Sequence, residues 1–393
     1  MTTDNEALAE AARARDALKA WLLTKAYPLW WTVGYDHQRG GFQEKLDVDG
    51  SPVDAPRRAR VQPRQVFSYA VAGELGWKGP WRKAVQGGLD WYLEHYTRPD
   101  GLFRTLVAAD GTPLDDKVDL YDQAFGLFAL ATAYGALDQP PELATHAAAL
   151  RDRLKAELGH PLAGFEESDP RTLPLLSNPH MHMFEASLAW AESDGGDTDG
   201  KWRALADEIA GLALTKFIDP KSGGLREFFD GDWNPAPGIE GRIVEPGHQF
   251  EWAWLLLRWA KIADRPDAAA AARRLIEIGE GPGVDPVRGV AMNQLLDDMS
   301  VHDASARLWP QTERIKAFAQ LALESGAADD WRGAVRGVRG LMKYFSSDLA
   351  PGLWRDKYQP DGRFVQEPAP ASSFYHIVCA VLVLDRAIKA AGA

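Results

Sequence analysis

The sequence predicts an all-α protein folded as an (α/α)6 barrel, in which six helical hairpins close into a ring. A glycine-containing turn recurs six times along the chain at nearly constant spacing. Between the turns, helical segments alternate between an amphipathic and a largely apolar type. No change of composition and no Pro- or Ser-rich linker divides the chain. We therefore expect residues 1–393 to form a single domain, with short β-turn loops at one end of the barrel.

The recurring turn is a Gly followed by an apolar residue and then by polar ones. Consecutive turns are 60, 63, 60, 65 and 63 residues apart, measured between the markers Gly41, Gly101, Gly164, Gly224, Gly289 and Gly352. Such a unit is too long for one helix and has room for a loop and two helices. The spacing therefore predicts six repeats of one helical hairpin.

The helices between the turns fall into two sets. Amphipathic segments, with charges on one face, are predicted as the outer helices: Leu8–Tyr27, Trp81–Tyr96, Pro141–Leu158, Lys201–Phe217, Pro266–Gly279 and Asp330–Phe345. Segments rich in Ala and aromatic residues are predicted as inner helices, buried on most sides: Arg64–Leu75, Tyr121–Tyr134, His182–Ala191, His248–Ala263, Trp309–Leu323 and Phe374–Ala390. Closing the hairpins into a ring leaves no exposed end to cap.

Composition narrows the function classes. The formal net charge of −12 argues against nucleic acid and anionic membranes as partners. Cys379 is the only cysteine, which excludes an internal disulfide and a thiolate zinc site. No apolar run has the ~20 residues of a membrane span and no signal peptide is visible, so we expect a cytoplasmic protein. We expect it to be a monomer or a homodimer. Fifteen tryptophans suggest stacking on sugar rings, and hence a neutral small-molecule partner.

Polar residues recur at the starts of the predicted inner helices, which meet at one end of the barrel. From Arg64, the anchors Gln123, His182, His248, Gln311 and His376 follow at steps of 59, 59, 66, 63 and 65 residues. Ordinary helix caps are Ser, Thr, Asp or Asn, so histidine and arginine at these places indicate a functional site. His37, His95, His146 and His160 are expected to be solvated, and the roles of His180 and His302 are open.

Two of these histidines stand three residues before a glutamate. The pairs His182–Glu185 and His248–Glu251 each share one face of a helical turn. A helix N-terminus favours the neutral imidazole, which suits a base. Neutral histidines with a deep arginine such as Arg64 suit proton abstraction next to a carbonyl. Further polar residues at the same helix starts are predicted to bind the substrate: Arg60, Tyr121, Asn178, Gln311 and Glu313.

Other chemistries have weaker support. His180 and His182 with nearby glutamates could supply metal ligands, yet no HExxH motif and no paired cysteines are present. No GxSxG elbow, P-loop or G-x-G-x-x-G phrase occurs. The sequence therefore predicts catalysis without a metal or a cofactor.

Several phrases resemble the signatures of the N-acylglucosamine 2-epimerase superfamily, in order and over essentially the whole chain. They are Arg64-Gln65-Val66-Phe67, Asn178-Pro179-His180-Met181-His182-Met183-Phe184-Glu185-Ala186, Gly247-His248-Gln249-Phe250-Glu251-Trp252, Trp309-Pro310-Gln311-Thr312-Glu313 and Tyr375-His376. The resemblance implies an (α/α)6 barrel that interconverts sugars at C1 and C2 through a cis-enediol, without a redox cofactor. The phrase at Asn178 and the ending Ala371–His376 are most similar to the mannose isomerase branch.

The resemblance also implies roles for individual residues. His248 and His376 match the two acid/base histidines, and His182 the third histidine. Arg64 matches the arginine that contacts the reacting oxygens, and Trp309 a tryptophan that stacks on the sugar. Carboxylates that orient the histidines or bind hydroxyls are matched by Glu185, Glu251 and Glu313.

The resulting hypothesis is an aldose–ketose isomerase acting on a free sugar, D-mannose to D-fructose or D-lyxose to D-xylulose. The first alternative is a sugar 2-epimerase, acting on glucose and mannose or on their N-acylamino forms, with His248 and His376 on opposite faces of C2. The second alternative is an (α/α)6 glycoside hydrolase, which would need Glu251 and Glu313 on either side of a glycosidic bond.

Overall fold

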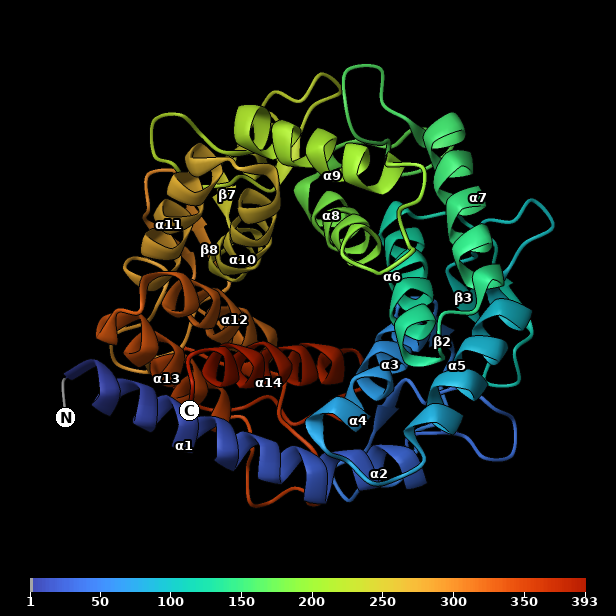
Figure 1. Cartoon of the computed structure of the whole chain (residues 1–393), viewed down its shortest axis with the longest axis horizontal. Helices are drawn as coiled ribbons and strands as arrows, with labels where there is room; N and C mark the ends of the chain where they lie inside the picture. The colour runs from blue at the N-terminus through green and yellow to red at the C-terminus, as the bar shows by residue number, and fades with distance from the viewer. Residues whose placement is uncertain (1–2) are drawn as a thin grey trace.

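The chain forms two concentric rings of helices around a central axis (Figure 1). The computed structural model describes residues 3–393. The inner ring is α3 (Val61–Ala70), α6 (Leu120–Ala136), α8 (Ser177–Ala191), α10 (Pro246–Ala263), α12 (Leu308–Ser325) and α14 (Ser372–Ala390). The outer ring is α1 (Thr3–Trp21), α5 (Trp81–Tyr96), α7 (Pro141–Leu158), α9 (Lys201–Leu212), α11 (Pro266–Glu280) and α13 (Ala328–Met342). The predicted (α/α)6 barrel is therefore confirmed.

The two ends of the chain close the ring. α14 packs against α3, and α1 packs against α13 and α14. A π-helical turn η1 (Leu22–Ala26) joins α1 to α2 (Tyr27–Thr32), and a short α4 (Ala72–Leu75) follows α3. Strand β1 (Lys45–Leu46) of the first repeat pairs with β12 (Ala369–Pro370) of the last. Covalently distant repeats are thus joined both by packing and by backbone hydrogen bonds.

Short antiparallel strands line the end of the barrel at which the inner helices begin. They belong to the turn loops, and most pairs link one repeat to the next. The remaining strands are β2 (Arg57–Arg58), β3 (Leu106–Val107), β4 (Pro113–Asp115), β5 (Leu175–Leu176), β6 (Phe228–Phe229), β7 (Ile243–Val244), β8 (Gln294–Leu296), β9 (Val301–Asp303), β10 (Ala306–Arg307) and β11 (Lys357–Tyr358). A second π-helical turn, η2 (Ala213–Phe217), ends the fourth outer helix, and η3 (Glu240–Arg242) precedes β7.

A side-chain amide fixes the glycine turn to the inner helix of the same repeat. Gln123 accepts a hydrogen bond from the Phe103 N–H at 2.9 Å and donates to the Phe103 carbonyl at 2.7 Å. The same bracket is made by Gln62 on Phe42, Gln249 on Leu225 and Gln311 on Ala291. In the third repeat, the Phe165 N–H donates to Nε2 of His180. Two of the anchors predicted to face a site, Gln123 and Gln311, therefore hold turns.

Several inner helices begin earlier than the sequence predicted. Two of the predicted inner helices begin at Arg64 and His182, whereas Pro63 and Pro179 already lie in the first turns of α3 and α8, and Pro310 lies in the first turn of α12. Pro246 is the first residue of α10, so it opens the helix instead of preceding it. Proline is tolerated there because first-turn N–H groups have no partner within the helix. Most predicted site residues consequently lie within the first two turns of the inner helices.

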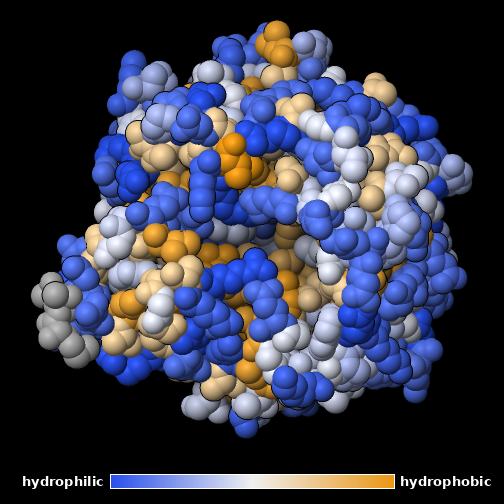
Figure 2. All heavy atoms as spheres, viewed as in Figure 1, coloured by the Kyte–Doolittle hydropathy of each residue, from blue (hydrophilic) through white to orange (hydrophobic). Residues whose placement is uncertain are grey.

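The tryptophans mostly build the core instead of a sugar-binding surface. Trp30, Trp190, Trp202, Trp252 and Trp354 have at most 1% of their surface exposed. Seen along the barrel, the molecule is hollowed at its centre and hydrophobic side chains border the hollow (Figure 2). Among residues 3–393, no helix combines the length and the apolar character required to cross a membrane.

The turn bracket gives a stability prediction. Gln123→Leu keeps the side-chain volume but leaves the buried N–H and C=O of Phe103 without partners. We expect the free energy of unfolding to fall by about 2–4 kcal/mol, measured by denaturant titration. The control Gln86→Leu, on the exposed face of α5, should change it by less than about 0.5 kcal/mol. Equal effects of the two substitutions would contradict the bracket's role.

Candidate active site

A cavity of about 300 Å³ opens at the end of the barrel where the inner helices begin. It brings together all three histidines that the sequence singled out, from α8, α10 and α14. Of the twelve predicted site residues, eight line it: Arg64, Tyr121, Asn178, His182, His248, Glu251, Trp309 and His376. The other lining residues are Leu176, Glu227, Phe228, Glu245 and Arg307.

His248 is held by two carboxylates. Its Nδ1 lies 2.9 Å from Oε2 of Glu227 and 3.4 Å from Oε2 of Glu245. Burial alone would lower the pKa of His248, but the charges of Glu227, Glu245 and Glu251 outweigh it and raise the pKa to about 10. The expectation of a neutral His248 at a helix N-terminus is therefore wrong, because nearby carboxylates exceed the effect of the helix dipole. This imidazole is a cation at neutral pH.

His376 has the opposite protonation state. Its Nδ1 lies 2.8 Å from Oε1 of Glu313, and its side chain is almost fully buried. Burial, and then the positive charges of Arg64 and Lys316, hold the pKa of His376 well below its ordinary value. A neutral imidazole whose Nδ1 is engaged can present Nε2 to a substrate as a base.

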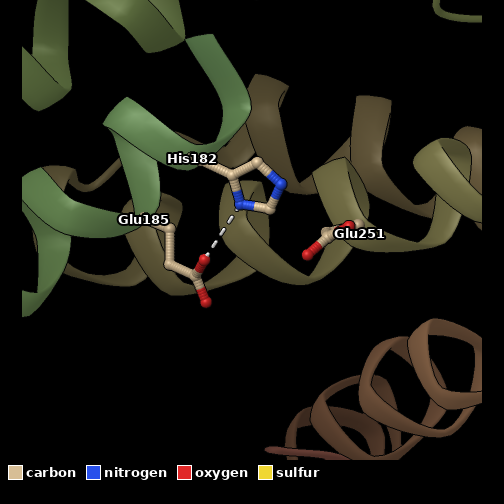
Figure 3. A group of neighbouring side chains, drawn as sticks. All are labelled: His182, Glu185 and Glu251. Atoms are coloured by element: carbon tan, nitrogen blue, oxygen red, sulfur yellow. Dashed lines mark hydrogen bonds and ion pairs between the residues drawn. The ribbon is translucent and has the colours of Figure 1, made fainter. Parts of the chain in front are cut away.

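His182 lies between two carboxylates, as Figure 3 shows. Its Nδ1 is 3.3 Å from Oε2 of Glu185, which confirms that the pair shares one face of α8. Burial lowers the pKa of His182. Burial would raise the pKa of Glu185, but its bond to His182 and the charge of Lys316 bring it to about 2. Glu185 also accepts a hydrogen bond from the Tyr375 hydroxyl at 2.5 Å, so it orients His182 from behind.

Trp309 lies between His248, whose pKa is raised, and His376, whose pKa is lowered. Its ring centroid is 4.9 Å from that of His248 and 5.8 Å from that of His376. A Cβ at Gly247 would come within 2.5 Å of this ring, so the glycine allows the indole to approach α10. Trp309 thus forms an apolar wall between a cation and a base.

Arg64 and neighbouring polar atoms supply donors and acceptors to the cavity. Nη2 of Arg64 donates to the Tyr121 hydroxyl at 2.5 Å, and its guanidinium lies 4.3 Å from the centroid of Phe125. Within residues 3–393, Nε of Arg64, Oδ1 of Asn178 and Oε1 of Glu227 are buried and lack hydrogen-bond partners. Buried polar atoms without partners are costly, so a bound molecule rich in hydroxyls would satisfy them.

Four predicted substrate contacts do not line the cavity. Gln311 is fully buried and engaged with Ala291. Glu313 and Glu185 lie behind His376 and His182 and orient their imidazoles. Arg60 is bound to Asp122 and faces an adjacent cavity. Position on a helix start alone could not separate a residue that faces the axis from one that faces the turn.

Glu227, Glu245 and Arg307 line the cavity, although the sequence analysis assigned them no role. Nδ1 of His248 is engaged by Glu227 and Glu245, and not by Glu251, which shares its helix face. Glu227 ends the fourth glycine turn, at the place that Glu44 and Glu167 occupy in the first and third. A carboxylate at this point of the repeat was the signal that could have identified it.

In the described part of the chain, residues 3–393, two sets of side chains could supply metal ligands, with their donor atoms within 4.8 Å of one another. They are His182, Glu185 and Glu251, and Glu251, Glu313 and His376. The Lys316 ammonium pairs with Glu313 and lies 3.4 Å from Oε1 of Glu251, so a cation already balances these carboxylates. His180 cannot join His182 at a metal, because both its nitrogens bond to backbone atoms of Phe165 and Leu176.

Comparison with known proteins agrees with the fold. The family model of N-acylglucosamine 2-epimerase (GlcNAc 2-epimerase) matches residues 40–380, and the chain belongs to this family. It is accordingly an enzyme of the sugar epimerase and isomerase class.

Individual relatives are similar over nearly their whole length. The chain is 50% identical to a protein of Rhizobium meliloti (strain 1021) named mannose-6-phosphate isomerase, over 95% of this chain and 97% of that one. A crystal structure of D-mannose isomerase superposes with a TM-score of 0.83 at 20% identity, covering 95% and 97% of the two chains. Cellobiose 2-epimerase from Bacillus thermoamylovorans B4167 gives 0.84 at 19% identity, covering 95% and 99%.

The two carboxylates on His248 give a prediction for the pH dependence of activity. Removing the charge in Glu245→Gln should lower the pKa of His248 by about 1–3 units. The loss of kcat/KM on the alkaline side should therefore begin at lower pH than in the unmodified enzyme. Glu277→Gln, which removes the same charge from the exposed face of α11, serves as the control and should leave the profile unchanged. An unchanged alkaline limb in Glu245→Gln would contradict an acid role for His248.

Proposed function

We propose that residues 1–393 form one catalytic domain that interconverts free D-mannose and D-fructose, or D-lyxose and D-xylulose, through a cis-enediol. The observation that carries this proposal is the pair of histidines with opposite protonation states around Trp309. Two titratable groups whose pKa values are pushed apart can serve as acid and base at the same pH. The names of the similar mannose isomerases support the choice of sugar.

Ring opening uses the protonated histidine. His248 gives its proton to O5 of the cyclic sugar while the O1 hydroxyl loses a proton, so that the C1–O5 bond breaks and C1 becomes an aldehyde. The carboxylates of Glu227 and Glu245 stabilise the imidazolium before the transfer. The proton from O1 restores the imidazolium, and no net charge is produced.

Isomerisation uses the neutral histidine. Nε2 of His376 takes the C2 proton, the electron pair forms the C1–C2 double bond, and O1 becomes an enediolate oxygen. Arg64 stabilises that oxygen by charge and hydrogen bonding. Returning the proton to C1, with transfer of the O2 proton to O1, gives the ketose. His376 is regenerated in its neutral form.

The cavity favours an unphosphorylated sugar. Of its two arginines, Arg307 is paired with a carboxylate, 3.3 Å from an oxygen of Asp356, and Arg64 is assigned to the reacting oxygens. Glu227 and Glu245 line the same cavity and would repel a phosphate dianion. The proposed substrate is therefore a free sugar, although the relative from Rhizobium meliloti is named mannose-6-phosphate isomerase.

A 2-epimerase is the second candidate, and the charge of His248 is the observation that favours it. An imidazolium on the opposite face of C2 could reprotonate the carbon that His376 has deprotonated, which would invert C2. The glycoside hydrolase alternative loses support, because Glu313 is fully buried between His376 and Lys316 and does not line the active-site cavity that Glu251 lines.

The reaction is tested by NMR in deuterated water with mannose, glucose, fructose, N-acetylmannosamine and mannose 6-phosphate. We expect mannose to give fructose carrying deuterium at C1. An epimer with deuterium at C2 would favour the second candidate, and preference for the phosphorylated sugar would contradict the charge argument. If no sugar of the panel reacted, the proposed function would be abandoned.

Substitutions of the two histidines should impair different steps of the reaction. His376→Asn should abolish both turnover and exchange of the C2 proton with solvent. His248→Asn should lose turnover of the cyclic sugar but retain slow action on the open-chain fraction. Each loss should be at least ~10²-fold, as expected for removal of a general acid or base. Retained C2 exchange in His376→Asn, together with its loss in His248→Asn, would show that the roles are reversed.

A further inference from the structure

Lys316 is a lysine without exposed surface on α12, one helical turn after Glu313. Its ammonium pairs with Glu313, lies 3.4 Å from Oε1 of Glu251, and lies 4.0 Å from the centroid of Trp254. It does not line the active-site cavity, and no step of the proposed reaction uses it. Burying a charged lysine costs desolvation free energy, so Lys316 is expected to have a specific role at this position.

Lys316 contacts Glu313 on the side of the carboxyl group that faces away from His376. One oxygen of this carboxyl group is bonded to Nδ1 of His376, and the other pairs with Lys316. If Glu313 is ionised, it can only accept a hydrogen bond, so Nδ1 of His376 must carry the hydrogen. Nε2 then has a free lone pair. If Glu313 is protonated, it can donate to Nδ1, the hydrogen moves to Nε2, and the imidazole cannot act as a base there.

Without Lys316, the ionised state of Glu313 would be difficult to maintain. Burial raises the pKa of Glu313, and the charge of Lys316 opposes that rise. Burial and the neighbouring Glu313 likewise raise the pKa of Glu251 to about 6. Two buried carboxylates side by side do not both ionise unless a cation lies close to them. Lys316 contacts both.

We propose that Lys316 is a positioning residue: its ammonium keeps Glu313 ionised, which holds the hydrogen of His376 on Nδ1 and leaves Nε2 free to take the substrate proton. This proposal rests on the proposed function for the use made of Nε2, but the tautomer itself is a property of the enzyme without substrate. Charged and titratable groups face His376 from every helix packed around it: Arg64 on α3, His182 and Glu185 on α8, Glu251 on α10, Glu313 and Lys316 on α12, and Tyr375 and Cys379 on α14.

The test removes the ammonium and reads the tautomer directly. In Lys316→Met, we expect ¹⁵N NMR of the imidazoles to show the His376 hydrogen moved from Nδ1 to Nε2. With the sugar that the enzyme turns over, kcat should fall by on the order of 10²–10⁴, the range seen when a catalytic histidine is held in the wrong tautomer. KM should change by less than about threefold, because Lys316 does not reach the cavity. Lys316→Arg should restore the Nδ1 tautomer.

A matched control comes from the same helix. Arg314→Met removes a buried cation that pairs with Glu280 towards the outer ring. It should cost stability but leave the tautomer and kcat unchanged. A double substitution gives a second check, because Lys316→Met should have little further effect in a Glu313→Gln background if Lys316 acts only through Glu313.

Glu313→Gln also serves if Lys316→Met does not fold. With Lys316 present, the amide oxygen should turn to the ammonium and the NH₂ group to His376, which again moves the imidazole hydrogen to Nε2. An Nδ1 tautomer in Glu313→Gln or in folded Lys316→Met would overturn the proposal. If the tautomer moved as expected but no sugar of the panel reacted, the proposed function would fail and the positioning role would stand.

Discussion

The carboxylates buried behind the cavity wall depend on one cation for their ionisation, and the histidine chemistry depends on them. Glu251 and Glu313 both contact Lys316, whose charge also lowers the pKa of Glu185. Glu185 orients His182 and Glu313 orients His376, each through Nδ1, so each imidazole directs its other nitrogen away from its partner. A polar layer of this kind is stable only when every member is satisfied. Its geometry therefore restricts both the position and the protonation state of the bases.

The pKa values of His248 and His376 differ because the carboxylates that hold them lie in different surroundings. Within residues 3–393, no lysine or arginine pairs with Glu227, which holds His248. Glu245 lies beside Glu227, so the negative charge of both carboxylates acts on the imidazole. Glu313, which holds His376, shares its charge with Lys316, and Arg64 adds a further positive charge nearby. In the proposed reaction, the same residue type thus serves as an acid in one repeat and as a base in another. Local charge balance decides the outcome, since both histidines lie within the first five residues of their inner helices.

Much of this arrangement could be predicted from the sequence, because it follows the repeat. The spacing of the glycine turns predicted six hairpins, and the helix-start histidines fell at His182, His248 and His376, which the structure brings to one cavity. The predictions that were wrong concern the direction in which a side chain points from its helix. Gln311 and Trp309 lie two residues apart on one helix, yet the first brackets Ala291 and the second lines the cavity. The partner of His248 is Glu227, 21 residues earlier in a turn, and no helical periodicity relates them.

The turn brackets explain how partners that are distant in the sequence are held at a fixed distance from one another. Gln249 binds both backbone groups of Leu225, which lies two residues before Glu227, and it directly follows His248 on α10. One amide side chain therefore fixes the turn that carries the carboxylate to the helix turn that carries the imidazole. A rigid backbone link of this kind lowers the entropy cost of holding an ion pair in one geometry. The feature that stabilises each repeat of the barrel is thus also the feature that sets the distance between His248 and Glu227.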